Sequence, residues 1–533
     1  MKRLIIIITA LLFGLQAHAQ HAAERVYVST DRDWYAAGET LYLSAFCVDV
    51  RDGVRLSPVS AMAYVELASA EGFALGGKLA LVDGRGAGSL VLPRTLPSGN
   101  YRLSAYTRIS PACASKTISV YNTLSQARVP EGVDVGHLRE SSAFPAASDF
   151  IQAATLPDGR IQLTSRTGVS LSVAVFRDEP FPSYGTVPMA EALAMTAGGA
   201  PEKAIPEYDG EILTLRLLET DGSPMTGDDG REILVSHPGH PEDLYPATLL
   251  PDGSAQVFTA NIFGSGDLVV TLDENAPAFR ATVDSPFRKL SPGGIPPLVL
   301  DPSLSAPLSR MSVRMQVTSD FDADTLYLHL PTRRLRYLPE QGIHYALDDY
   351  TRFATLQEVL QEYLSDIRAR RQGDDWVLQI RCRERENGPL SFWESPSLIL
   401  VDGVPVLSHS LVYSMDPLLV KSVDVYPRFF ALGGTVYAGI ASFLTYKGDM
   451  GGLRFGDQVR VLAFEGPSLP VAFAPSPSPR YPNERETLLW QPLVELSDGE
   501  TLTLPSIKVE EGCVLVVEGI TETGSPVYYR QQL

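Results

Sequence analysis

The sequence has no long apolar run beyond its N-terminal stretch. Residues 4–15 are apolar but too few to span a bilayer comfortably, and no later segment offers about 18 consecutive apolar residues. Lys2 and Arg3 precede this stretch and Ala17-His18-Ala19 follows it, the pattern of a secretory signal peptide over residues 1–19. Cleavage would leave no cysteine at the new N-terminus, so a lipoprotein anchor is not supported. We expect an exported mature chain without a transmembrane segment.

Positive charge and cysteine are both scarce. The chain has 44 Lys and Arg residues against 63 Asp and Glu residues, a formal net charge of −19 that disfavours nucleic-acid binding. Its four cysteines could pair in three ways in an oxidising compartment. Cys47 and Cys113 fall in the same predicted N-terminal domain and form the favoured pair, although spacing alone cannot show whether they bond. Cys382 and Cys513 are expected to be single buried thiols.

Motifs of catalysis and cofactor binding are absent from the sequence. It contains no Gly-x-Ser-x-Gly, His-Glu-x-x-His, Cys-x-x-Cys or phosphate-loop pattern. The glycines of residues 84–88 resemble a dinucleotide loop only superficially, because the predicted strand 89–92 follows them where a phosphate-binding helix is needed. A β-turn explains them better. We predict no catalytic residues, no cofactor and no enzymatic activity.

Two clusters of residues could supply metal ligands. Asp320, Asp322 and Asp324 have a calcium-like spacing, but Thr325 and Pro331 stand where an EF-hand loop needs Gly and Glu. A solvated acidic turn is the preferred interpretation.

The second cluster combines imidazole and carboxylate groups, the ligand types that suit zinc. His237, His240, Glu242 and Asp243 lie within seven residues, but two prolines and a glycine are interspersed among them. That composition indicates a loop between strands, and the sequence offers no further ligand nearby. We predict no metal site.

Short apolar segments separated by Gly- and Pro-rich turns dominate the chain. At roughly 100–200 residues per domain, 533 residues predict three to five domains. The pattern is that of β-sandwiches, so the predicted fold class is mainly β and multidomain, with one small α/β domain. The predicted segments are 24–125, a β-sandwich; 146–190, a second β-region; 207–287, a third β-sandwich; 288–344, a connector; 345–455, the α/β domain; and 456–533, a C-terminal β-domain. Residues 191–206, rich in Ala, Gly and Pro, are interpreted as a linker.

The α/β domain is predicted from a change of periodicity. Thr355 and Glu358 have the spacing of a capping box, and apolar residues recur at helical spacing from Leu356 to Ile367. A strand over residues 376–382 follows, with apolar and polar side chains alternating.

Arginines gather in this α/β domain although the protein as a whole is acidic. Such a patch could bind an anionic partner or the protein's own acidic domains; the alternative is a solvated strand face with Glu384 and Glu386 nearby. The candidate partner-binding residues are Arg368, Arg370, Arg371, Arg381, Arg383 and Arg385.

Two stretches resemble known families. Residues 24–32 and 35–39, with 96–103 and 105–107, resemble the opening of a macroglobulin-type β-sandwich. The helix from Thr355, residues 398–405 and 416–420, and Gly433-Gly434 leading to residues 438–440 resemble the plug domain of TonB-dependent receptors. The order of these modules resembles a family of exported Gram-negative envelope proteins that join macroglobulin-like domains to a plug-like domain.

Departures from these families limit what the resemblance implies. A receptor barrel of 22 strands would need several hundred residues after the plug, whereas 81 residues follow Gly452. The thioester sequence Gly-Cys-Gly-Glu-Gln of alpha-macroglobulins is absent. The resemblance therefore implies a non-enzymatic binding or assembly protein of the periplasm or outer membrane, with a protein partner contacted by the plug-like domain. The alternatives are a degenerate protease inhibitor or sensor, with residues 189–206 as its exposed loop, and a glycan-acting enzyme with a carboxylate pair.

Overall fold

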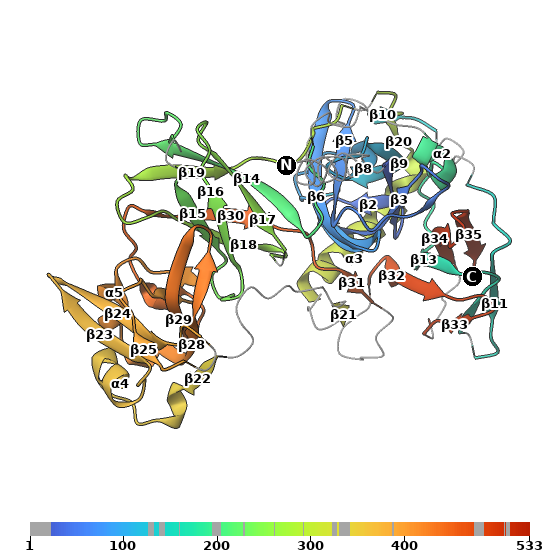
Figure 1. The fold of residues 1–533 in the computed structure, drawn as a ribbon. Coiled ribbons are helices and arrows are strands. Elements are labelled where there is room, and N and C mark those ends of the chain that lie inside the picture. The colour runs from blue at the N-terminus through green and yellow to red at the C-terminus, as the bar shows by residue number, and fades with distance from the viewer. Residues whose placement is uncertain are drawn as a thin grey trace, which may run out of the picture. The chain divides into compact units, whose positions relative to one another are not determined.

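We analysed a computed structural model of the chain. It describes residues 23–125, 133–137, 144–194, 204–321, 328–329, 342–473 and 484–533, apart from residues 159, 227–229, 261, 292, 386–387, 506 and 508–511. Most described elements are strands, which confirms the mainly β, multidomain fold class (Figure 1). The chain divides into unit 1, residues 1–209, 287–332 and 467–533, and unit 2, residues 210–286 and 333–466. The predicted signal peptide lies outside the described residues.

The first β-domain of unit 1 is a sandwich whose strands are largely buried on both faces. Leu41, Leu43, Ala45 and Cys47 of one strand all enter its core. The strand order is β1-β3-β7-β6-β5-β8-β9-β2, with β4 paired to β3. Its strands are β1 (Glu24–Thr30), β2 (Trp34–Ala36), β3 (Thr40–Asp49), β4 (Arg55–Leu56), β5 (Met62–Ser69), β6 (Gly72–Val82), β7 (Arg85–Val91), β8 (Gly99–Tyr106) and β9 (Cys113–Tyr121).

The glycine-rich segment 84–88 belongs to this sandwich. Asp83 and Gly84, both at positive φ, turn the chain between β6 and β7, and the remaining glycines lie within β7. A side chain at Gly84 would collide with the Cys47 carbonyl oxygen, because its Cβ would lie 2.7 Å away. The β-turn interpretation of this motif is therefore confirmed.

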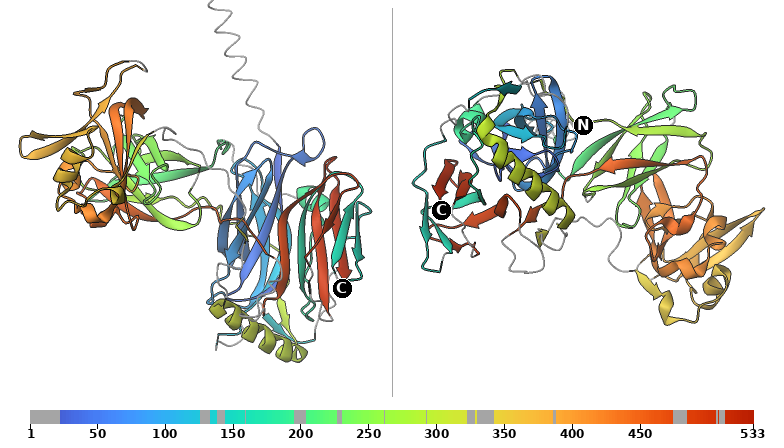
Figure 2. Two further views of the ribbon diagram at one scale, coloured as in Figure 1. Left: turned by 90° about the horizontal axis from the view of Figure 1, so that it is seen from below. Right: turned by 180° about the vertical axis from the view of Figure 1, so that it is seen from behind.

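The second β-domain of unit 1 is discontinuous in sequence. Residues 146–190 and 456–533 were predicted as separate β-regions, but the structure pairs strands from both in the same sheets. One sheet has the order β32-β13-β34-β35 and the other β11-β12-β33. The strands are β11 (Ile151–Thr155), β12 (Ile161–Ser165), β13 (Val169–Arg177), β32 (Thr487–Leu496), β33 (Thr501–Thr503), β34 (Cys513–Thr521) and β35 (Pro526–Gln532). Figure 2 shows these strands beside those of the first β-domain.

Unit 1 also contains helices and short strand pairs. Some of them lie within residues 288–344, which were predicted to be a connector. The helix α3 (Ser305–Phe321) follows η1 (Pro302–Leu304) and packs Met311 and Met315 against Trp34 and Phe181. The parallel pair β10 (Val133–Val135) and β20 (Leu298–Leu300) lies in the same unit, as does the antiparallel pair β21 (Leu328–His329) and β31 (Val471–Ala472). The helix α2 (Met189–Ala194) occupies the start of the predicted linker and buries Met189, Ala192 and Leu193.

The third β-domain belongs to unit 2 and is also completed by a distant strand. Its two sheets have the orders β17-β14-β19 and β16-β15-β18-β30. The strands are β14 (Glu211–Glu219), β15 (Glu232–Ser236), β16 (Leu244–Thr248), β17 (Ser254–Thr259), β18 (Ser265–Thr271), β19 (Phe279–Val283) and β30 (Val459–Glu465). Because β30 follows the α/β elements in sequence, those elements are inserted into this domain.

The α/β module comprises residues 343–455. A five-stranded sheet, β22-β28-β29-β26-β27, and a three-stranded sheet, β23-β24-β25, share a core with two short helices. The elements are β22 (Ile343–Ala346), η3 (Leu347–Asp349), α4 (Leu356–Glu362), β23 (Ile367–Gln372), β24 (Asp375–Cys382), β25 (Ser391–Phe392), β26 (Leu398–Val401), β27 (Val404–Pro405), α5 (His409–Tyr413), η4 (Pro417–Leu419), β28 (Val420–Leu432), β29 (Thr435–Thr445) and η5 (Met450–Gly452).

The helix predicted from Thr355 exists but is shorter than expected. Thr355 and Glu358 form the capping box, and the apolar residues Leu356, Val359 and Leu360 are buried. The helix ends at Glu362, and Ile367, which the periodicity placed on the helical face, begins β23 opposite Ile380. Strand pairing with β24 therefore outweighs the local helical pattern. None of the helices in the described residues is long and apolar enough to cross a membrane.

Candidate functional site

Three of the six candidate arginines share one face of the β23–β24 ribbon, and a fourth, Arg383, directly follows β24 and continues that face. Arg368 lies opposite Gln379, and Arg370 lies opposite Val377. Side chains alternate along a strand, so Arg381 and Arg383 project to the same side as these residues. Phe392 of β25 pairs with Arg381 and adds an aromatic ring. We call Arg368, Arg370, Arg381, Arg383 and Phe392 the basic face.

Arg368 is held in place by neutral partners. Its Nη2 and Nε donate hydrogen bonds to Oε1 of Gln379, at 2.7 and 3.1 Å, and its guanidinium lies 4.2 Å from the centre of the Phe392 ring. The amide of Gln379 in turn donates to the Trp393 carbonyl oxygen at 3.0 Å. These contacts fix the guanidinium without neutralising its charge, so the charge stays available to an anion.

The other arginines of the basic face differ in how far their charge is neutralised. Arg381 forms an ion pair with Asp366, with 2.8 Å between Nη2 and Oδ1. Arg370 is exposed and forms no ion pair with any residue that the structure describes. Arg383 is also exposed. Exposed charges of this kind contribute about 0–1 kcal/mol to stability, so folding alone does not account for their clustering.

Two predicted arginines lie elsewhere, and one arginine was missed. Arg371 projects to the opposite face of the ribbon and donates to the Gly373 carbonyl oxygen at 3.2 Å. Arg385 lies beyond the end of β24. Arg428 is exposed and is brought beside Arg383 by a backbone bridge between the two residues. Only strand pairing places it there, so no local pattern in the sequence could have found it.

A pocket of about 610 Å³ lies elsewhere in unit 2, between the third β-domain and the α/β module. Trp376, Leu398, Tyr437 and Phe455 give it a largely apolar wall. His409 also lines it and accepts a hydrogen bond at Nδ1 from the Leu378 N–H at 3.0 Å. Burial lowers the pKa of His409 to about 4, so the imidazole is neutral at physiological pH. The pocket thus combines an apolar wall and a neutral imidazole with the exposed carboxylates of Glu274 and Asp375.

The motif Asp402-Gly403 forms the turn between β26 and β27 and is buried. The Asp402 carboxylate accepts from the N–H of Thr445 at 2.7 Å, its hydroxyl at 2.6 Å and the Met450 N–H at 2.8 Å. Gly403 has φ +83°, and a Cβ there would lie 2.8 Å from the His240 carbonyl oxygen. The turn therefore packs against the β15–β16 loop of the third β-domain, and its role is structural.

That loop brings the candidate metal ligands together. Ligand atoms of His237, His240 and Asp243 all lie within 4.8 Å of one another, and the two imidazole rings stack with centroids 4.3 Å apart. Glu242 lies in the same loop but outside this group. No metal site was predicted for these residues, because local sequence does not show whether loop side chains converge.

The remaining candidates are the aspartates with calcium-like spacing and the four cysteines. Asp320 is exposed in the last turn of α3, whereas Asp322 and Asp324 lie outside the described residues. Cys47 and Cys113 are buried free thiols, so the favoured disulfide is not formed. Cys382 and Cys513 are single buried thiols, as predicted. Burial raises the pKa of Cys382 to about 11, which makes it an unreactive thiol.

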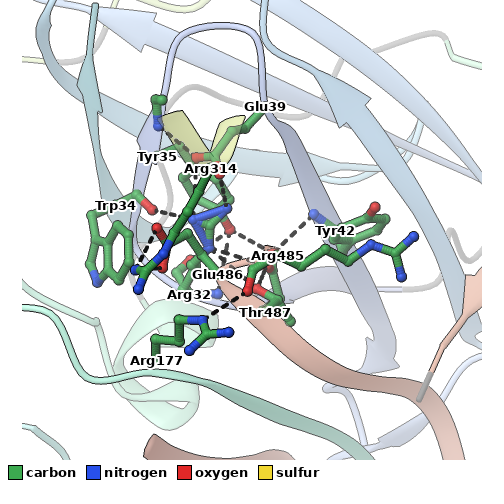
Figure 3. A network of polar contacts seen from close by, with 12 residues as sticks. Arg32, Trp34, Tyr35, Glu39, Tyr42, Arg177, Arg314, Arg485, Glu486 and Thr487 are labelled. Carbon is green, nitrogen blue, oxygen red and sulfur yellow. Dashed lines mark hydrogen bonds and ion pairs between the residues drawn. The ribbon is translucent and has the colours of Figure 1, made fainter. Parts of the chain in front are cut away.

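The residues that resemble a macroglobulin sandwich form a buried polar network in unit 1 (Figure 3). Arg32 forms an ion pair with Glu39 at 3.0 Å, and its Nε donates to the hydroxyl of Thr487 at 3.2 Å. The Tyr35 hydroxyl donates to Asp31 at 2.6 Å. Because Thr487 belongs to the second β-domain, the network joins the two sandwiches of unit 1.

The helix α3 extends this network. Arg314 contacts Glu179 at 2.8 Å and Glu486 at 3.1 Å, and Arg310 contacts Glu179 at 2.7 Å. Burial raises the pKa of Glu179, but hydrogen bonds from both arginines outweigh it and leave the pKa below its ordinary value. Burial raises the pKa of Glu39 to about 7, with Arg32 opposing the shift. The network is structural, since its arginines are paired with carboxylates of the same unit.

Comparisons with known proteins show only a distant likeness. No protein-family model matches the sequence, and no curated protein sequence is similar to it. Trypsin-activated alpha-2-macroglobulin from Escherichia coli is 11% identical over 96% of this chain and 41% of that protein, with a TM-score of 0.23. Salmonella alpha-2-macroglobulin reacted with methylamine is 10% identical over 96% of this chain and 39% of that protein, also with a TM-score of 0.23.

Dimeric latent PorU from Porphyromonas gingivalis is 9% identical over 80% of this chain and 34% of that protein, with a TM-score of 0.17. The chain spans about two fifths of the length of the first two macroglobulins. The structure thus has a distant similarity to multidomain β proteins of the bacterial macroglobulin type, and no functional argument rests on it.

Proposed function

We propose that this chain is a non-enzymatic binding protein of the bacterial cell envelope, and that its α/β module captures an acidic surface of a partner protein. The observation that carries the proposal is the basic face. Arg368, Arg370 and Arg383 are exposed on one sheet face of a chain whose net charge is −19. Clustered positive charge in such a setting attracts an acidic partner and orients it.

Sequence features suggest the cellular compartment in which the partner lies. The predicted signal peptide over residues 1–19 implies export. The resemblance of residues 398–405 and their flanking segments to receptor plug domains suggests an outer-membrane protein or a TonB-system component as the partner. On this proposal, unit 1 is a rigid support, because buried ion pairs join its two β-domains and α3.

A site-specific crosslink tests the proposal directly. A photoreactive amino acid replaces Arg370 in the tagged full-length chain, expressed in the source cells, and captured peptides are identified by mass spectrometry. The matched control places the same group at Val313, an exposed residue of α3. Capture from position 370 alone of one envelope protein, through a peptide rich in Asp and Glu, supports the proposal. Equal capture from both positions, or capture through a basic peptide, contradicts it.

The same experiment separates the two alternative functions. A protease captured in place of an acidic envelope partner would favour the inhibitor or sensor hypothesis. Its candidate loop is partly fixed, because α2 is docked and the Glu207 carboxylate accepts from the Tyr64 hydroxyl at 2.8 Å. Residues 195–203 of that loop lie outside the described part of the chain.

The glycan-acting enzyme has one observation in its favour. Glu274 and Asp375 both line the pocket of unit 2, and glycoside hydrolysis uses a pair of carboxyl groups. Both side chains are exposed, however, and a general acid needs a drier environment to hold its proton at neutral pH. We therefore propose binding rather than catalysis. Glycan hydrolysis by the wild-type chain that is lost in Glu274→Gln would overturn this choice.

A further inference from the structure

The β15–β16 loop of the third β-domain holds a convergent set of nitrogen and oxygen ligands. His237 Nδ1 lies 3.2 Å from Asp243 Oδ2, and the ring of His240 stacks on that of His237 at an interplanar angle of 14°. We propose that His237, His240 and Asp243 bind one zinc ion. This inference does not depend on the proposed partner-binding function.

The separation of His237 and Asp243 fits a single ion. Two ligands bound to zinc at about 2.0–2.2 Å with tetrahedral angles lie roughly 3.3 Å apart, close to the observed separation of His237 and Asp243. The farthest pair of ligand atoms lies within 4.8 Å. Because the two imidazole rings are stacked and nearly parallel, one ion cannot lie in both ring planes, so zinc binding requires the His240 ring to rotate out of the stack and complete a three-ligand face. A mixed imidazole and carboxylate set favours zinc over calcium or magnesium, which prefer oxygen ligands.

The surroundings orient the ligands before any ion arrives. The Tyr245 hydroxyl donates to Asp243 Oδ1 at 3.1 Å, which directs the other carboxylate oxygen toward His237. A side chain at Gly266 would place its Cβ 3.1 Å from His237 Nε2, so the glycine makes room for the imidazole against β18. Outer hydrogen bonds of this kind are typical of histidine and carboxylate metal ligands.

The backbone of the loop is equally constrained. The N–H of His240 donates to the His237 carbonyl oxygen at 3.1 Å, and the N–H of Asp243 donates to the His240 carbonyl oxygen at 2.9 Å. Between them, the N–H of Gly239 donates to the Asp402 carbonyl oxygen at 2.8 Å. All three contacts lie within unit 2. Zinc would therefore stiffen the loop where it rests on the Asp402-Gly403 turn of the α/β module.

Zinc uptake by the full-length, untagged, metal-stripped chain tests the proposal. Equilibrium dialysis against Zn²⁺ with elemental analysis should show a site that His240→Asn weakens at least about tenfold, since one of three ligands is lost. His344→Asn is the matched control. His344 Nδ1 lies 2.6 Å from Asp424, a similar pair without a second imidazole, and its loss should leave zinc affinity unchanged.

Hydrogen exchange supplies a readout that is independent of stoichiometry. Zinc should slow exchange of the Gly239 amide in the wild-type chain and in His344→Asn, but not in His240→Asn. The proposal is overturned if the wild-type protein takes up no zinc at a free concentration of roughly 100 μM. That concentration is well above the dissociation constants of ordinary protein zinc sites. It is also overturned if His240→Asn binds zinc as tightly as wild type, because the ion would then be held elsewhere.

Discussion

Arginine has different surroundings in the two units of this chain. In unit 1, Arg32 and Arg314 are enclosed by carboxylates and hold β-domains together. In unit 2, Arg368 and Arg370 are exposed, and Arg368 is fixed by an amide and an aromatic ring that leave its charge intact. The residue type is the same, but neutralised arginines indicate architecture whereas exposed, oriented arginines indicate recognition.

Breaking the buried network of unit 1 should have the largest effect on the free energy of unfolding. Arg32→Met leaves Glu39 and Asp31 without their buried counter-charge, a loss that costs about 3–5 kcal/mol in comparable buried pairs. Denaturant unfolding followed by hydrogen exchange should show this loss in unit 1. Arg160→Met, which removes an exposed partner of Asp158, is the control and should change stability by less than about 1 kcal/mol. Equal effects would mean that the network is not structural.

The change in the stability of unit 1 with pH should be the next largest effect. The folded pKa of Glu39 is raised to about 7 by burial, from an ordinary value of 4.5. Its contribution to stability is therefore fully present below pH 4.5 and is lost as pH rises through 7. The loss is up to about 3 kcal/mol. Glu39→Gln should flatten this decline, whereas Asp158→Asn should not. An unchanged slope in Glu39→Gln would refute the assignment.

Unit 2 should respond to pH in the opposite direction. Burial lowers the folded pKa of His409 to about 4, from 6.5. Its contribution is present above pH 6.5 and is lost as pH falls toward 4, about 2 kcal/mol of it by pH 5. Hydrogen exchange of the α/β module at pH 7 and pH 5 measures this loss, and His409→Gln should diminish it. Equal protection of wild-type unit 2 at both pH values would contradict the prediction.

Neutralising the basic face should have the smallest effect on stability. The triple variant of Arg368, Arg370 and Arg383 to Gln removes exposed charges, so the free energy of unfolding should change by about 1 kcal/mol or less. Thermal and denaturant unfolding provide the measurement. A loss as large as that of Arg32→Met would show that these arginines belong to the architecture and would remove the contrast between the two units.

Local patterns in the sequence predicted much of this structure. Alternation in residues 376–382 and the capping box at Thr355 are both present, because each depends on neighbouring residues. The helix α3 was missed although its Met311 and Met315 are both buried and Pro307 stands in its first turn, where proline is tolerated. The proline and glycine content of residues 285–308, which include its first turn, led to the prediction of a connector.

Local sequence patterns could not predict which strands pair when they lie far apart in the sequence. The β13 strand pairs with β32 and β34, more than 300 residues later, so two predicted domains are one. The same limitation hid Arg428 beside Arg383 and the convergence of the His237, His240 and Asp243 side chains. In each case the sequence supplied the residue types, and only the tertiary fold decided which of them meet.

Partner capture by the triple variant tests the central claim most directly. The wild-type chain and the variant with Arg368, Arg370 and Arg383 changed to Gln are crosslinked in parallel in intact source cells, and the yield of the partner is quantified at matched expression. Loss of an electrostatically steered contact predicts at least about a tenfold drop in yield, with unfolding unchanged. Undiminished capture by a correctly folded variant would show that the basic face does not bind the partner.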